Sequence, residues 1–128
     1  MQTNEELVKE FYKSFKNKDH DYHKFCRNNI EWMTMEGMPN GGRYIGIKSV
    51  FEEYFPKMLS NFKEFPAQPN DFLSIDDKVI VFGRYHGESK LRKNFDVPFC
   101  HVYIMQGNKI LQFKQFTDTE KIHEAIRF

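Results

Sequence analysis

The segment VPFCHVYIMQGNKI, residues 97–110, carries one imidazole, His101, within a run of apolar side chains. The reference pKa of histidine lies near neutral pH, so His101 could donate or accept a proton in a reaction. Alternation along a strand places His101 on one face with Phe99 and Tyr103, and Cys100 on the other, which excludes a Cys–His nucleophile pair. The structural alternatives are a core histidine hydrogen-bonded to Tyr103, a backbone carbonyl or a water, or a histidine at a dimer interface.

A second candidate is Glu36, at the end of the segment IEWMTME, residues 30–36. Period-two alternation predicts a strand here and places Glu36 on the face of Trp32. Half-burial of the carboxyl group among Trp32, Met35 and Met38 would raise its pKa toward the range of a general base. The alternative is a solvated carboxylate at the edge of a loop.

The length, charge and composition of the chain limit the functions in which these residues could take part. At 128 residues, the chain is expected to form one domain over residues 1–128. Its 19 Lys and Arg against 18 Asp and Glu give a net charge of +1, without the basic stripe that nucleic-acid binding requires. The 14 Phe and 6 Tyr are typical of a ring-rich core or of a pocket for flat apolar ligands.

The sequence favours a cytoplasmic protein with reduced thiols and no membrane partner. The segment MQTNEELVKE lacks the pattern of a signal peptide, and no apolar run approaches the length of a membrane span. Cys26 and Cys100 are too few for a disulfide framework. His20 and His23 have no third ligand nearby, so no metal site is expected, and the absence of a Gly-rich phosphate loop predicts no cofactor.

Apolar spacing predicts helices over residues 4–17, 19–27 and 47–60, with Pro56 interrupting the last of them. Between the second and third helices lie the strand over residues 30–36 and a Gly- and Pro-rich loop. In the second half of the chain, apolar runs separated by short polar segments predict an antiparallel meander followed by a short helix, TEKIHEAI. Its strands are expected over residues 72–75, 78–88, 95–106 and 109–117.

This order predicts an α+β fold with helices packed on one face of a curved sheet. Two segments of the meander, Val79–Phe82 and Val102–Met105, are apolar on both faces. A sheet with one solvated face should alternate between apolar and polar residues. We therefore expect the helices to cover one face and a second copy of the chain to cover the other, as a homodimer.

The element order and the phrases GGRYIGIKSVFEEYF, VPFCHVYIMQGNKI and FKQFTDTEKI resemble the SnoaL-like branch of the nuclear transport factor 2-like superfamily, which includes ketosteroid isomerases. The resemblance implies a cone in which three N-terminal helices pack on a strongly curved, mostly antiparallel sheet around an apolar cavity. Dimers through the outer sheet face are common in such a family. The fold hosts enzymes, carriers and binding modules, so it does not specify an activity.

The resemblance also implies roles for single residues. His101 matches the position of an acid that donates a hydrogen bond to the substrate of ketosteroid isomerases, and Glu36 lies one residue from the match to their base. Asp118 matches an aspartate that some SnoaL-like cyclases use for proton transfer, although it could equally cap the final helix. Phe11 replaces the oxyanion tyrosine, and Tyr12 lies about 100° around the helix. Ketosteroid isomerisation itself is therefore not expected.

Together these observations predict a small protein that binds an apolar, ring-containing molecule. If it is an enzyme, we expect cofactor-free proton transfer of the isomerase, cyclase or dehydratase type, with Glu36 as base and His101 as acid. A non-catalytic binding or sensing module, and a structural dimer with a filled interior, are the alternatives. Beside His101, the predicted pocket is lined by Phe11, Phe15, Trp32, Tyr54, Phe99 and Tyr103.

Overall fold

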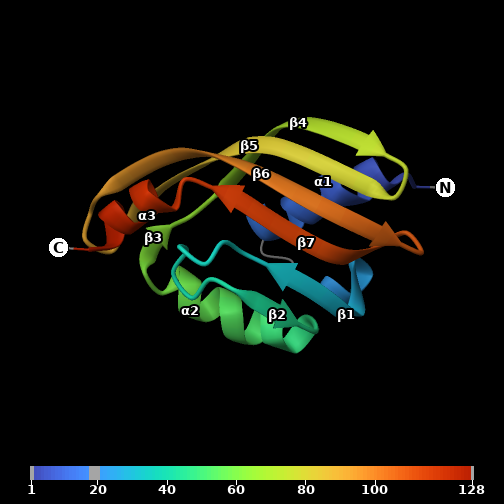
Figure 1. Cartoon of the computed structure of the whole chain (residues 1–128), viewed down its shortest axis with the longest axis horizontal. Helices are drawn as coiled ribbons and strands as arrows, with labels where there is room; N and C mark the ends of the chain where they lie inside the picture. The colour runs from blue at the N-terminus through green and yellow to red at the C-terminus, as the bar shows by residue number, and fades with distance from the viewer. Residues whose placement is uncertain (1, 18–20, 128) are drawn as a thin grey trace.

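A strongly curved, mixed seven-stranded sheet forms the frame of the molecule (Figure 1). The computed structural model describes residues 2–17 and 21–127. The strands are β1 (Cys26–Met33), β2 (Arg43–Ile45), β3 (Phe62–Glu64), β4 (Ala67–Ile75), β5 (Lys78–Ser89), β6 (Asn94–Gln106) and β7 (Lys109–Thr117). They run in the order β2–β1–β7–β6–β5–β3, with β4 also paired to β5. The β1–β7 pair is parallel and the other pairs are antiparallel.

The helices lie along the inside of the curve and at one end of it (Figure 1). Helix α1 packs on β4 and β5, the segment η2–α2 lies beside β2 and β3, and α3 packs on β5 and β6. This arrangement confirms the predicted cone-shaped α+β fold. In the part of the chain that the structure describes, every helix is too short or too polar to span a bilayer. The helices are α1 (Asn4–Lys16), the 3₁₀ turn η1 (Tyr22–Lys24), the π-helix η2 (Lys48–Tyr54), α2 (Phe55–Leu59) and α3 (Thr119–Ile126).

A capping box begins α1. The Thr3 hydroxyl accepts a hydrogen bond from the backbone N–H of Glu6, and the Glu6 carboxylate accepts one from the backbone N–H of Thr3. The N-cap is therefore Thr3, and the helix begins at Asn4, where the predicted helix starts. Helical periodicity then buries Leu7, Val8 and Phe11 against the sheet.

The meander of β5, β6 and β7 lies within a residue of the predicted strands. Gly107 and Asn108 join β6 to β7 with φ angles of 59° and 61°, the geometry of a type I′ hairpin turn. The register places His101 opposite Val81 on β5 and Gln115 on β7. These three residues form one row on the concave face of the sheet, toward the helices.

Strand β1 differs most from its prediction. It begins at Cys26 and ends at Met33, where residues 30–36 were expected. After Met33 the chain turns: Thr34 and Gly42 exchange hydrogen bonds, and the Met38 N–H donates to the carbonyl of Met35. The predicted loop then continues into the short strand β2, which the sequence analysis missed. Strand β4 begins at Ala67, five residues before its expected start.

The helical predictions need two corrections. The segment predicted as one helix over residues 47–60 is a π-helix followed by a short α-helix, and Pro56 lies in the first turn of the latter, where its missing N–H costs no hydrogen bond. Of the predicted helix over residues 19–27, positions 19 and 20 lie outside the described residues. The remainder forms only the 3₁₀ turn η1 before β1 starts.

Candidate functional site

His101 lies at the centre of the concave face with 3% of its surface exposed. Its Nδ1 is 2.6 Å from the hydroxyl oxygen of Tyr12 on α1, and its Nε2 is 2.5 Å from the hydroxyl oxygen of Tyr85 on β5. Both ring nitrogens are therefore hydrogen-bonded, and each partner comes from a different element. The imidazole joins the helical layer to the sheet through hydrogen bonds.

These contacts belong to a longer series of polar side chains, which we call the polar chain: Tyr103, Tyr12, His101, Tyr85 and Gln115. Tyr103 packs edge-on against Tyr12 with ring centroids 5.9 Å apart, and its side chain adds to the effect of burial in raising the pKa of Tyr12. At the other end, Nε2 of Gln115 donates to the Tyr85 hydroxyl over 2.8 Å. The polar chain thus crosses the concave face from α1 to β7 without a charged residue.

Burial sets the protonation states along the polar chain. Burial lowers the pKa of His101 well below its ordinary value, because the charged imidazolium is poorly solvated in the interior. Burial also raises the pKa values of Tyr12, Tyr85 and Tyr103, which keeps their hydroxyl groups protonated. A neutral imidazole has one N–H and one lone pair, so His101 donates to one tyrosine and accepts from the other.

Aromatic rings hold the imidazole in place. The ring of Phe99 stacks on His101 with centroids 3.9 Å apart, and Phe113 approaches it edge-on at 4.7 Å. Phe99 can occupy this position because its cross-strand partner is Gly83. A Cβ atom at Gly83 would lie 2.5 Å from the Phe99 ring, so a larger residue there would displace the ring.

The structure buries most of the predicted pocket residues, but against one another. Phe11 contacts Trp32 and Tyr103, and Trp32 stacks on Phe113 with centroids 3.8 Å apart. Tyr54 is buried next to Tyr44 and Phe55, with ring centroids 4.9 and 5.1 Å from theirs. These ring contacts lie where the prediction placed a ligand, so a bound ring would have to displace some of them.

Phe15 departs from the predicted pocket, since 37% of its surface is exposed. It lies near the end of α1, where its ring contacts Phe51 and Phe55. Phe51 also stacks on Tyr22 with centroids 3.8 Å apart. Phe15 is therefore part of an aromatic cluster at the rim of the interior, together with Tyr22, Phe51 and Phe55.

Glu36 is exposed, in contrast to the half-buried carboxylate that was expected. The expectation required the strand to continue to residue 36, but β1 ends at Met33 and the chain turns before Glu36. The structure therefore does not bring Glu36 into the polar chain. Its role as a base remains a prediction from sequence, and the geometry gives no support to it.

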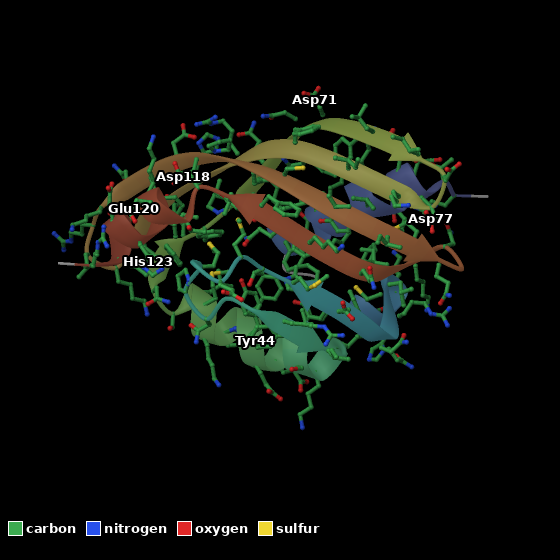
Figure 2. All side chains as sticks on the ribbon, viewed as in Figure 1. Tyr44, Asp71, Asp77, Asp118, Glu120 and His123 are labelled. Carbon is green, nitrogen blue, oxygen red and sulfur yellow. The ribbon has the colours of Figure 1, made fainter. Side chains whose placement is uncertain are left out.

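Asp118 is the N-cap of α3, as the structural alternative supposed. Its Oδ1 accepts a hydrogen bond from the backbone N–H of Lys121 over 3.3 Å. Figure 2 shows Asp118 with Glu120 and His123 at the end of the molecule where α3 lies. Capping explains the position of Asp118 without a role in proton transfer.

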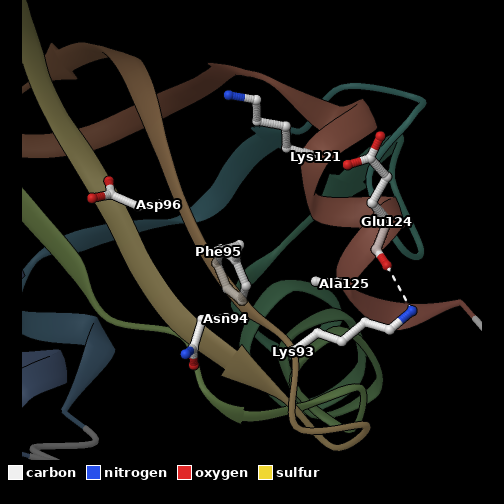
Figure 3. Close-up of a pocket in the computed structure, with 7 residues that line it drawn as sticks. All are labelled: Lys93, Asn94, Phe95, Asp96, Lys121, Glu124 and Ala125. Atoms are coloured by element: carbon white, nitrogen blue, oxygen red, sulfur yellow. Dashed lines mark hydrogen bonds between the residues drawn. The ribbon is translucent and has the colours of Figure 1, made fainter.

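Two surface hollows lie away from the polar chain. One, of about 440 Å³, lies between the start of β6 and α3, where Lys93 donates to the carbonyl groups of Glu124 and Arg127 (Figure 3). The other, of about 430 Å³, lies around His23, Arg27 and Lys109. Neither hollow is lined by a predicted site residue, and Lys93 is occupied in closing the last turn of α3.

Comparison with solved structures places this geometry in a known group. An NTF2-like protein from Burkholderia thailandensis is 26% identical and superposes with a TM-score of 0.92 over 100% of both chains. The chain belongs to the nuclear transport factor 2-like superfamily. A putative SnoaL-like polyketide cyclase from a Jannaschia species has the same fold, with 14% identity and a TM-score of 0.82 over 96% of this domain and 90% of its own chain.

A further similar structure is that of TerC, which was co-crystallised with polyporic acid. It is 24% identical to this nuclear transport factor 2-like domain, with a TM-score of 0.89 over 96% of this chain and 97% of its own. No family model and no curated protein matches the sequence. The comparisons thus establish the superfamily and the fold, and the residues inside the cone must supply the argument about function.

Sequence reasoning identified His101 but missed three members of the polar chain in this domain. Tyr12 was set aside because it lies about 100° from Phe11, yet the helix lies close enough to the sheet for both side chains to reach the interior. Tyr85 and Gln115 had a usable signal, because each lies at a concave-facing position of an alternating strand. What the alternation lacked was the register that brings them to His101.

Proposed function

We propose that this nuclear transport factor 2-like domain binds a small, ring-containing molecule on its concave face, with the polar chain as the hydrogen-bonding anchor. The observation that carries the proposal is His101, neutral and buried among aromatic rings while hydrogen-bonded to Tyr12 and Tyr85. An aromatic interior with a few convergent polar groups is the usual composition of a small-molecule site.

The rim cluster of Phe15, Tyr22, Phe51 and Phe55 supports an entry route. Phe15 is partly exposed, and its neighbours contact one another through ring faces and edges. A flat ligand ring can replace such contacts with similar ones when a side chain rotates aside. The co-crystallisation of TerC with polyporic acid shows that a similar fold has been studied with an organic acid, and it suggests a first probe.

As the accompanying chemistry, we propose cofactor-free proton transfer through His101 and Tyr12. In this step the Tyr12 hydroxyl gives its proton to one ligand atom and takes the Nδ1 proton of His101, whose Nε2 takes the hydroxyl proton of Tyr85. The reverse transfers take a proton from a second ligand atom, so the net change is an isomerisation without a redox partner. The imidazole stays neutral throughout, as its burial favours, and the N–H of Gln115 stabilises the Tyr85 oxygen while that oxygen carries the negative charge.

Titration with polyporic acid tests the binding proposal, because Trp32 is the single tryptophan and lies inside the cone. We expect saturable quenching of its fluorescence, and at least tenfold weaker binding in the His101→Phe variant. The matched control is Cys100→Ala, one residue away on the opposite face of β6, which should bind as the wild type does. Absence of saturable binding in the wild type would refute the proposal.

We also propose a homodimer through the convex face of the sheet. Two cross-strand rows there are largely apolar, Phe82–Cys100–Phe116 and Leu73–Ile80–Val102. Phe82 and Phe116 are 45% and 47% exposed, and Leu73 is exposed beside them. Apolar patches of this kind mark association surfaces more often than free surface.

A cytoplasmic location completes the proposal. Cys26 and Cys100 are both free thiols, which agrees with a reducing compartment. Burial raises the pKa of the Cys26 thiol to about 12, which keeps it protonated and unreactive. Localisation of a tagged full-length chain in its own host would test this assignment.

A further inference from the structure

Among the described residues, the buried side-chain amide of Gln115 forms a hydrogen bond through its nitrogen but not through its oxygen. Gln115 lies on β7 with 5% of its surface exposed, in the same concave row as His101. Its Nε2 donates to the Tyr85 hydroxyl. Its Oε1 is buried and accepts no hydrogen bond from any group in residues 2–17 or 21–127.

In the structure Nε2 of Gln115 faces the Tyr85 hydroxyl, and this orientation leaves Oε1 without a donor among the described residues. Buried polar atoms in native proteins are almost always paired, so this atom calls for a specific explanation.

The orientation of the amide also determines the direction of the hydrogen bonds at His101. When Gln115 donates to Tyr85, the Tyr85 hydroxyl proton is free to point at Nε2 of His101. The neutral imidazole then carries its proton on Nδ1 and donates it to Tyr12. A group that donates to Oε1 would favour this orientation and so fix one tautomer of His101.

We propose that Oε1 of Gln115 is a ligand subsite that accepts a hydrogen bond from a hydroxyl group on the ring of the bound molecule. The inference rests on the proposed binding function and adds the ligand class, a phenol or enol rather than a plain hydrocarbon. Gln115 is then a residue that determines specificity, while His101 and Tyr12 remain the groups for proton transfer. A site built to hydrogen-bond a hydroxyl discriminates strongly against the analogue that lacks it.

A matched pair of probes, 2-naphthol and naphthalene, tests the subsite in the full chain. By fluorescence titration, we expect the wild type to bind 2-naphthol at least tenfold more tightly than naphthalene. In the Gln115→Met variant the ratio should fall below threefold, through weaker binding of 2-naphthol alone. Retained naphthalene binding shows that this variant is folded. The control Gln112→Met, on the same strand but with its side chain in a convex row, should keep the wild-type ratio.

The outcomes separate the subsite from the function on which it rests. If both probes bind the wild type with equal affinity, the cone binds rings but the Gln115 subsite is wrong. If neither probe binds, the proposed function fails and the subsite fails with it. A crystal structure with 2-naphthol should place its oxygen within hydrogen-bond distance of Oε1. A water molecule at Oε1, with the ring bound elsewhere, would overturn the proposal.

Discussion

The two faces of β6 differ in how deeply their side chains are buried and in the hydrogen bonds that these side chains form. On the concave face, the polar imidazole of His101 is buried between Phe99 and Tyr103, with both nitrogens hydrogen-bonded. On the convex face, Cys100 and Val102 are only partly buried. Within the three consecutive residues Cys100, His101 and Val102, the polar side chain is thus inside and the apolar ones reach the surface.

The comparison shows that alternation identifies the faces of a strand without revealing what covers them. The concave face is completed by the chain itself, through α1 and the aromatic core. The convex face has apolar rows that no other element of the described structure covers. The chain itself therefore covers one apolar face of the strand, and the proposed homodimer would cover the other.

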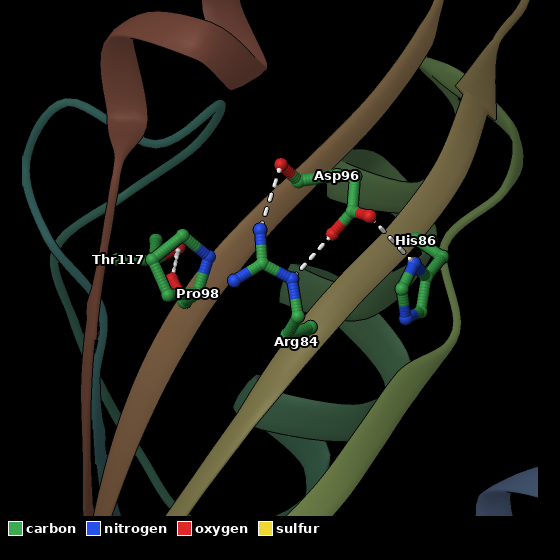
Figure 4. Close-up of polar contacts among 5 residues, drawn as sticks. All are labelled: Arg84, His86, Asp96, Pro98 and Thr117. Atoms are coloured by element: carbon green, nitrogen blue, oxygen red, sulfur yellow. Dashed lines mark hydrogen bonds and ion pairs between the residues drawn. The ribbon is translucent and has the colours of Figure 1, made fainter.

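The convex face is not apolar throughout. At one end of it Arg84 donates to Asp96 over 2.6 Å, and Asp96 also approaches His86 at 3.3 Å (Figure 4). The hydrogen bond from Arg84 is the main reason that the pKa of Asp96 lies below its ordinary value. This charged group borders the apolar rows and remains solvated, in contrast to the buried polar chain.

The largest effect is expected from the His101→Phe variant. It leaves the hydroxyl groups of Tyr12 and Tyr85 without their partner in the interior, at a cost of about 2–4 kcal/mol in the free energy of unfolding. Urea denaturation followed by circular dichroism measures the loss. For comparison, Cys100→Ala on the convex face should cost less than about 1 kcal/mol. Equal losses in the two variants would contradict the contrast between the faces.

The convex face is tested by the variant that combines Phe82→Lys and Phe116→Lys. Charges in these rows should raise the dissociation constant of the dimer at least about 100-fold, or about 2.7 kcal/mol, with little change in the fold of the monomer. Sedimentation velocity at micromolar concentration measures the change in mass. Leu59→Lys, on an exposed position of α2, is the control and should leave the mass unchanged. A monomeric wild type would refute the dimer.

A pH dependence should distinguish the buried histidine from the surface groups. The pKa of His101 is lower in the folded chain than in the unfolded chain, where it is near 6.5. As the pH falls below 6.5, the unfolded state takes up a proton that the folded state does not. Stability should therefore decrease on acidification, by up to about 1.4 kcal/mol per pH unit. The wild-type curve between pH 5 and 7 should be steeper than that of His101→Phe, and parallel curves would contradict this.

The smallest effect is expected at the charged end of the convex face. Asp96→Asn removes an exposed ion pair with Arg84, and such pairs contribute little because water screens them. The free energy of unfolding should change by less than about 0.5 kcal/mol in urea denaturation. A loss as large as that of His101→Phe would mean that the surface group, rather than the polar chain, stabilises this part of the sheet.

Local patterns were enough to predict the meander and the face of His101. Strands β5, β6 and β7 are long and their connections are short, and Asp76, Gly107 and Asn108 in two of these connections suit positive φ, so periodicity gave the positions of the strands. Strand β1 was misplaced because Arg27, Asn28 and Asn29 interrupt its apolar pattern. Its pairing with the distant β7, including a shift of register after Cys26, decides its extent.

The candidate site was predictable only in part, for a related reason. His101 stands out in its segment, but Tyr12, Tyr85 and Gln115 become its partners only through the packing of α1 and the register of three strands. Glu36 was assigned to the interior by extending an alternation beyond the end of the strand. A short turn cannot be located from alternation, and a shift of one or two residues decides whether a carboxylate is inside or outside.

The parallel pairing of β1 with β7 has a consequence for biosynthesis. Strand β1 leaves the ribosome well before its neighbour in the sheet, residues 109–117, which lie far beyond it along the chain. Until then β1 presents an unpaired edge, and the polar chain lacks Gln115. Nascent chains that stop before residue 109 should therefore be the species most dependent on chaperones, and the cone should close in a late step that joins the two halves of the chain.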